Sequence, residues 1–184
     1  MPVARLAVRR AHRAVCLSRA GRERAVLSRR DRRWRDPSRP VLNDPDGAEP
    51  LVLTLERAVG CIARGIAKAR ALDFCVAVAV VDDAGHLVAC HRMDGALWIT
   101  PEIARAKANA AAAFRTTTLD METRFSQGRQ LFASTVASLG DYQLVFGRGG
   151  VPLLDDGRVV GAVGVSGAVP ADNDHAIAEA AAGG

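Results

Sequence analysis

The chain has few aromatic residues, only 4% of its 184 residues, although 49% of the sequence is apolar. The core must therefore be built mainly from Ala, Val, Leu and Ile, and such small side chains favour close packing of helices on a sheet. The sequence also lacks the uninterrupted apolar run of ~18 residues that a membrane span needs. No arginine pair is followed by the apolar stretch of an export signal. We therefore expect a protein that is neither secreted nor membrane-spanning.

The four cysteines form no CxxC pair, which argues against a zinc knuckle and a redox dithiol. Cys61 and Cys75 lie within apolar patterns, and we interpret them as reduced core thiols. Reduced thiols favour a cytoplasmic location. The sequence has no Walker loop, nucleophile elbow or dinucleotide fingerprint, because Gly161, Gly164 and Gly167 follow a GxxGxxG spacing inside a predicted strand. We therefore expect no nucleotide cofactor.

Positive charge is concentrated in one segment of the chain. Residues 1–50 contain 13 arginines, no lysine and 6 acidic residues, whereas residues 51–184 contain 12 basic and 14 acidic residues. The first segment ends in a proline-rich stretch and lacks a clean helical period, so we interpret it as a disordered extension. Residues 51–184 would then form the folded domain.

A second interpretation of residues 1–50 is an arm that binds nucleic acid or an acidic membrane surface. Arginine clusters without interleaved aromatic residues carry little specificity, so we do not expect nucleic acid as a partner. Deleting residues 1–50 and measuring salt-dependent DNA binding tests this hypothesis, because binding to phosphates weakens steeply with salt. We expect the deletion to leave DNA binding unchanged.

Apolar periodicity and turn signals predict an order of elements in which hairpins dominate. The predicted elements are a helix over 54–72, strands over 74–81 and 86–92, a helix over 100–114, a short helix starting at 117, an ambiguous segment over 128–141, strands over 142–146, 151–154 and 158–165, and a closing helix over 172–182. This order predicts an α/β (α+β) sandwich with a mainly antiparallel sheet of about five strands and helices packed on it. The arrangement resembles that of profilin and roadblock domains.

The run from Gly147 to Gly167 is the most informative part of the sequence. Two β-branched stretches flank an Asp-Asp-Gly turn, and Asp-Gly in this position is the strongest short-range signal for a hairpin. Glycines border both stretches, and a residue without Cβ lets the backbone approach a ligand or another backbone closely. The hairpin is therefore either one wall of a small-molecule site or a buried hairpin with glycine bulges.

The end of the second predicted strand carries polar residues with ligand chemistry. Arg92 and Asp94 lie on the same side of an extended chain, where they could pair with each other or hold a ligand, and arginine suits carboxylates such as haem propionates. His86 and Cys90 would face one side of the strand and His91 the other, so the three cannot converge on one metal. Either histidine alone is a candidate axial ligand of haem. The alternatives are a surface ion pair and ordinary polar strand residues.

Lys107 interrupts the apolar face of an alanine-rich helix. It either points to solvent or, if it faces the sheet, needs an anionic partner, because a buried unpaired ammonium is too costly. Asp94 or a ligand carboxylate would be that partner. Asp172, Asp174 and His175 begin the closing helix, where acidic residues are expected from capping and the helix dipole alone.

Five motifs, in order from about residue 53 to 182, resemble the GlcG/HbpS family of haem-binding-type domains, which includes the C-terminal domain of PduO-type cobalamin adenosyltransferases. They read LTLERA, VAVVDDAGHLVACHRMDGA, IARAKANAAAAF, GRGGVPLLDDGRVVGAVGVSG and a D-x-x-x-A closing helix. The resemblance implies an α/β sandwich that assembles into higher homo-oligomers, with haem bound by some members. The chain departs from the family pattern at Asp174-His175, which is commonly Asp-Glu, and at Gly167-Ala168, which is a glycine pair.

The family's shared positions occur in this chain as Arg92, Met93, Asp94, Gly95, Lys107, Gly149, Gly150, Val151, Pro152, Gly161, Gly164, Ser166 and Gly167. The haem-iron ligand is not a shared position, so none is transferred.

Our leading hypothesis is a homo-oligomer that binds haem or a related small anionic ligand. Its pocket would combine the Arg92–Gly95 loop, Lys107 and the Gly149–Pro152 loop. A second hypothesis makes the same pocket the active site of an enzyme acting on a 2-hydroxy or aromatic acid. Arg92 would then anchor the carboxylate, and Lys107 or His91 would transfer a proton.

Overall fold

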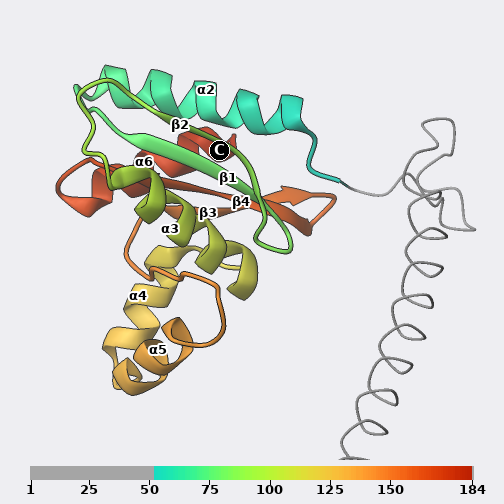
Figure 1. Cartoon of the computed structure of the whole chain (residues 1–184), viewed down its shortest axis with the longest axis vertical. Coiled ribbons are helices and arrows are strands. Elements are labelled where there is room, and N and C mark those ends of the chain that lie inside the picture. The colour runs from blue at the N-terminus through green and yellow to red at the C-terminus, as the bar shows by residue number, and fades with distance from the viewer. Residues whose placement is uncertain (1–51, 184) are drawn as a thin grey trace, which may run out of the picture. The chain divides into compact units, whose positions relative to one another are not determined.

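The computed structural model describes residues 52–183 (Figure 1), so the arginine-rich segment over residues 1–50 lies outside the described residues. In chain order the elements are α2 (Leu55–Ala71), β1 (Ala77–Asp82), β2 (Leu87–Arg92), α3 (Thr100–Phe114), α4 (Thr118–Ser126), α5 (Gln130–Ala137), β3 (Gly150–Asp155), β4 (Arg158–Ser166) and α6 (Ala171–Ala182). The strands form one antiparallel sheet in the order β2-β1-β4-β3. The predicted α/β sandwich is confirmed.

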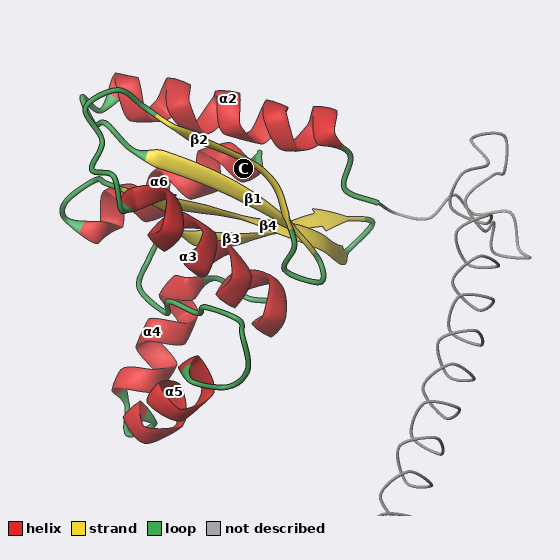
Figure 2. Cartoon of the chain, viewed as in Figure 1, coloured by secondary structure: helices red, strands yellow, loops and turns green. Residues whose placement is uncertain are grey.

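The sheet is covered on both faces by helices (Figure 2). Helices α2 and α6 pack on one face, where the main apolar core contains Val78 and Val80 of β1 together with Ile62 and Ile177 from the two helices. Helix α3 covers the other face, and α4 and α5 extend beyond it. Because β1 and β4 lie in the middle of the sheet, their side chains are buried on both faces. None of the helices within residues 52–183 is long and apolar enough to cross a membrane.

Small residues let α3 lie directly on the sheet. Ala104 and Ala108 of α3 are fully buried, and a Cβ built on Gly164 of β4 would collide with the Ala104 carbonyl oxygen and approach the Ala108 nitrogen to 2.7 Å. Glycine is required at this position because the helix backbone occupies the space of a side chain. The low aromatic content therefore reflects a helix–sheet contact that has no room for large side chains.

The β3–β4 hairpin has the geometry that its Asp-Gly signal predicts. Asp155 pairs with Arg158, and both residues between them have positive φ, 45° at Asp156 and 73° at Gly157. A two-residue loop with this backbone is a type I′ turn, whose twist matches the twist of the strands. The helix predicted over 54–72 begins after an N-cap: the Thr54 side chain accepts a hydrogen bond from the Arg57 amide.

Two predictions are wrong. The segment over 142–146 is a loop and not a strand: Phe146 stacks edge-on against Phe125 of α4, and the Val145 amide donates to the Ala106 carbonyl of α3 instead of to a strand. Packing against helices therefore overrides the β-propensity of this segment. Cys75 is exposed, whereas Cys61 is buried as predicted.

We predict opposite effects of alanine at two glycines. Gly164→Ala should lower the free energy of unfolding by ~1–3 kcal/mol, because the new methyl group displaces the α3 backbone. Gly60→Ala is the matched control: it lies within α2, its Cβ would meet only Arg64 at 3.7 Å, and alanine should stabilise the helix by ~0.5–1 kcal/mol. Urea denaturation of both variants measures the difference, and equal stabilities would contradict this packing argument.

Candidate functional site

Lys107 faces the interior and is paired there. Its side chain is 7% exposed, and its Nζ donates to Asp174 Oδ2 at 2.7 Å and to the Val165 carbonyl at 2.9 Å. The other carboxylate oxygen of Asp174 accepts from the Ala168 amide at 2.9 Å. The partner that a buried Lys107 requires is therefore Asp174 of α6, and the expectation of Asp94 or a ligand carboxylate as that partner is wrong. The interpretation of Asp174 as a simple helix-start residue is also too limited.

Burial outweighs pairing at the Asp174 carboxyl. Desolvation raises the pKa of Asp174 above its usual value of 3.8, although the hydrogen bond and charge of Lys107 and the amides of Ala168 and Gly167 act in the opposite direction. This balance is expected when two charges leave water together, because their attraction only partly offsets the lost hydration. The pair therefore fixes the position of α6 more than it adds stability.

The predicted Gly149–Pro152 loop packs tightly around this pair. A Cβ on Gly149, whose φ is +114°, would lie 2.8 Å from the Asp174 Cβ and 3.3 Å from Lys107 Nζ. A Cβ on Gly150 would lie 2.5 Å from the Lys107 carbonyl oxygen. Val151 is buried and Pro152 is half-buried in β3. The glycines thus make room for protein atoms. At Gly149 these are the Lys107–Asp174 pair and the Val165 carbonyl, and at Gly150 they are the α3 backbone and the Thr118 methyl group.

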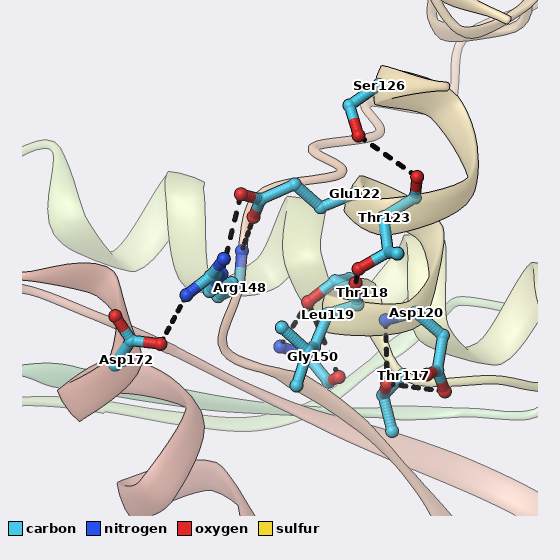
Figure 3. Close-up of polar contacts among 10 residues, drawn as sticks. All are labelled: Thr117, Thr118, Leu119, Asp120, Glu122, Thr123, Ser126, Arg148, Gly150 and Asp172. Atoms are coloured by element: carbon cyan, nitrogen blue, oxygen red, sulfur yellow. Dashed lines mark hydrogen bonds and ion pairs between the residues drawn. The ribbon is translucent and has the colours of Figure 1, made fainter. Parts of the chain in front are cut away.

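Polar contacts from α4 and α6 hold the same loop from both sides (Figure 3). The Gly150 amide donates to Thr118 Oγ1 at 2.8 Å. Arg148 lies between two acidic side chains and forms ion pairs with Glu122 of α4 and Asp172 of α6. This segment is therefore attached to both α4 and α6.

The structure separates the two halves of the predicted pocket. Strand β2, which ends at Arg92, and strand β3, which begins at Gly150, form opposite edges of the sheet, with β1 and β4 between them. Lys107 and the Gly149–Pro152 loop are therefore brought together, whereas Arg92, Asp94 and Gly95 belong to a different region of the molecule. Within residues 52–183, no ion pair joins Arg92 to Asp94.

The Arg92 region has a cavity of its own, about 600 Å³ in volume. It lies between α2 and the end of β2, and its lining consists of Ile66, Arg70, His91, Arg92, Met93 and Asp94. Ile66 and Arg70 are four residues apart and therefore share one face of α2. His91 pairs with Val78, which belongs to the core under α2, so the His91 position lies on the same side of the sheet. Two arginines and a histidine therefore line one cavity.

The other candidate metal ligands lie apart from this cavity. His86 precedes β2, and its Nδ1 is 3.2 Å from Asp82 Oδ2 at the β1–β2 turn. Cys90 packs against the α3 side of the sheet, opposite His91, as the alternation of the strand predicts. Burial raises the pKa of the Cys90 thiol, and the Glu102 carboxylate raises it further, so Cys90 is a poor nucleophile at neutral pH. The described residues include no cluster of three metal-ligating side chains.

Two important residues were not identified from the sequence. Arg70 is one of several basic residues on α2. It lines the cavity only because the end of β2 lies beside the helical turn that contains Arg70. For Asp174 the sequence contained two indications of its role. It lies in the D-x-x-x-A motif, and a buried Lys107 needs an anionic partner. Combining these signals requires knowing that α6 crosses the sheet near β4.

We predict that breaking the buried pair is far more costly than removing it. Lys107→Met should lower the free energy of unfolding by ~3–5 kcal/mol at pH 7, because it leaves the Asp174 carboxylate buried without its partner. The double variant Lys107→Met, Asp174→Leu should recover most of that loss. Chemical denaturation of the single and double variants measures the coupling, and additive losses would contradict a direct interaction.

The cost of Lys107→Met should also depend on pH. Lys107 lowers the pKa of Asp174, so its removal raises that pKa further above 3.8. The folded variant then retains a proton that the unfolded chain loses, and its stability falls as pH rises from about 3.8 through the folded-state pKa. Unfolding curves between pH 4 and 8 measure this slope, which Lys107→Met, Asp174→Leu should not show.

Comparison with known proteins agrees with the fold and the motifs. Residues 53–183 match the family described as "Haem degrading protein HbpS-like". Protein GlcG of Escherichia coli (strain K12) is 39% identical over 118 residues, which are 63% of this chain and 82% of GlcG. The crystal structure of HbpS has a TM-score of 0.66 at 29% identity and covers 77% of this chain and 96% of its own. The crystal structure of a PduOC:heme complex has a TM-score of 0.64 at 28% identity, with 72% and 94% of the two chains covered. The chain therefore belongs to the HbpS-like family.

Proposed function

We propose that this domain binds haem or a related anionic small ligand in the cavity between α2 and β2. The observation that carries the proposal is the convergence of Arg70, His91, Arg92 and Met93 on one cavity. Two arginines can each hold a carboxylate in bidentate geometry, and His and Met side chains are the usual axial ligands of haem iron. The family description and the PduOC:heme complex support the same ligand class.

The chain's own residues have separate tasks in this proposal. Arg70 and Arg92 bind the propionates; neither guanidinium is in an ion pair within the described part of the chain. His91 or Met93 offers a ligand atom to the metal, and Ile66 contributes apolar surface. A bound haem would supply redox chemistry at its iron. Asp94 and Gly95 shape the turn: Gly95 has φ +85° and its Cβ position lies 3.3 Å from the Cys75 sulfur.

A homo-oligomer is part of this proposal because one chain gives the cavity little apolar cover. Leu97 and Trp98, directly after the Arg92–Gly95 loop, are 70% and 76% exposed. Strand β2 is also an open edge of the sheet. Exposed apolar side chains beside an unpaired edge strand are typical of a subunit contact. A second copy of the chain at this edge would cover the ligand. A cytoplasmic location fits the free thiols of Cys61, Cys75 and Cys90.

The enzyme hypothesis uses the same cavity less well. His91 has no hydrogen-bond partner within residues 52–183 that would orient its ring for proton transfer, and the ammonium of Lys107 is occupied by Asp174 and Val165. Arg92 would still anchor a carboxylate. The geometry therefore favours binding of a carboxylate-bearing cofactor over acid–base catalysis by Lys107.

We predict saturable haemin binding with a shifted Soret band in the full-length chain. His91→Ala should change the position of the band, and Arg70→Gln combined with Arg92→Gln should weaken binding about 10- to 100-fold, because charge-assisted hydrogen bonds are lost. Arg124→Gln, an exposed arginine on α4, is the matched control and should bind like the unchanged chain. Absence of a Soret shift, or equal binding by all variants, would overturn the proposal. Native mass spectrometry of the same samples measures the subunit count and any retained ligand.

A further inference from the structure

Two further cavities lie on the α3 side of the sheet, away from the Arg92 region. One, about 530 Å³, lies between α3, the β1–β2 turn and the segment over 140–143. The other, about 340 Å³, continues toward α5. Gly85, Asn109 and Tyr142 line both, so the two cavities meet there. None of the residues that line the α2–β2 cavity belongs to this pair.

One stripe of α3 forms the floor of both cavities. Glu102, Arg105, Asn109 and Ala113 recur at intervals of three and four residues, so they share one face of the helix. The stripe changes from charged at the start of the helix to apolar near its end. The cavity pair is therefore polar at one end and apolar at the other.

Asn109 lies at the junction with an unused acceptor. The residue is 6% exposed, and its Nδ2 donates to the Gln143 carbonyl at 3.3 Å. That carbonyl determines the amide orientation, because only the amide nitrogen can donate to it. Oδ1 is buried without a hydrogen-bond partner in the described part of the chain and points toward Gly85, whose Cβ position is 3.5 Å away. A buried acceptor without a donor costs ~1–3 kcal/mol, so this position favours a ligand that donates a hydrogen bond.

The charges around Asn109 indicate the kind of donor. Glu102 and Asp141 line the polar cavity, and neither is in an ion pair within residues 52–183. Together with Asn109 Oδ1 they form a set of acceptors that suits an ammonium group. Arg105 lines the same cavity, is exposed and is also in no ion pair there, so it is available for a carboxylate.

The other cavity suits an apolar group. Its lining includes Phe114 of α3, Val136 of α5, and Leu139 and Leu144 from the following segment. Leu139 is 59% exposed and Tyr142 is 60% exposed.

We propose that this cavity pair binds a small zwitterion with an apolar side chain, of the class of apolar α-amino acids. The ammonium group donates to Asn109 Oδ1 and lies near Glu102 and Asp141, the carboxylate binds Arg105, and the side chain occupies the apolar cavity. The site is independent of haem binding, because it shares no residue with the α2–β2 cavity.

A ligand series on the unchanged full-length chain tests the chemistry. L-phenylalanine, phenethylamine and 3-phenylpropionate are titrated while the methyl signals of Val136, Leu139 and Leu144 are followed by NMR. L-phenylalanine should bind most tightly, phenethylamine about tenfold more weakly because it lacks the carboxylate, and 3-phenylpropionate most weakly because it lacks the ammonium group. No saturable shift, or binding of 3-phenylpropionate at least as tight as that of L-phenylalanine, would overturn the proposal.

A variant separates direct contact from a structural effect. Asn109→Ala should weaken L-phenylalanine and phenethylamine about tenfold and leave 3-phenylpropionate unchanged, whereas equal weakening of all three ligands would refute the contact. Arg124→Gln again serves as the control. Haemin titration of Asn109→Ala should match that of the unchanged chain, so the two proposals fail or succeed separately.

Discussion

The buried ion pair between Lys107 and Asp174 is the contact on which the other features of the fold depend. It joins α3 to α6 through β4, since Lys107 also donates to the Val165 carbonyl. Two charges that are removed from water stabilise each other only in a narrow range of geometries. The pair therefore restricts α3 and α6 to one relative arrangement. Gly149 has to be a glycine because its φ is +114° and because the pair and the Val165 carbonyl occupy the space of a side chain. Lys107, Asp174 and Gly149 thus form one structural unit.

Close packing on the α3 side of the sheet determines where ligands can bind. Ala104, Ala108 and Gly164 bring α3 against the strands and leave no space between them. Cavities form instead at the edges, where α2 meets β2 and where α3 turns a polar stripe toward the segment over 140–144. The two sites differ in charge: arginines dominate the first, and unpaired acceptors dominate the second. The two proposed ligands would therefore not compete for one site, because the cavities share no residue.

Most of the fold was predictable from local patterns. Helical periodicity and the Asp-Gly turn each act within a few residues, so α2, α3 and the β3–β4 hairpin were predicted nearly to their ends. The segment over 142–146 was predicted wrongly as a strand. Aromatic and branched residues favour strands, but here they form a loop that packs against helices. The predicted pocket was assembled from correct motifs, but motifs alone do not report which sheet edge each strand occupies.

The sequence by itself determined the family, the antiparallel sandwich and the identity of the residues with unusual chemistry, since these follow from motif order, periodicity and residue type. Only the tertiary structure decided the partners of those residues. The strand order β2-β1-β4-β3 separates Arg92 from Gly150, and the position of α6 places Asp174 where it forms an ion pair with Lys107. Partnership across the sheet depends on contacts distant in sequence, which no local pattern encodes. For that reason Lys107 is a structural anchor in this fold, and Arg92 carries the proposed ligand chemistry.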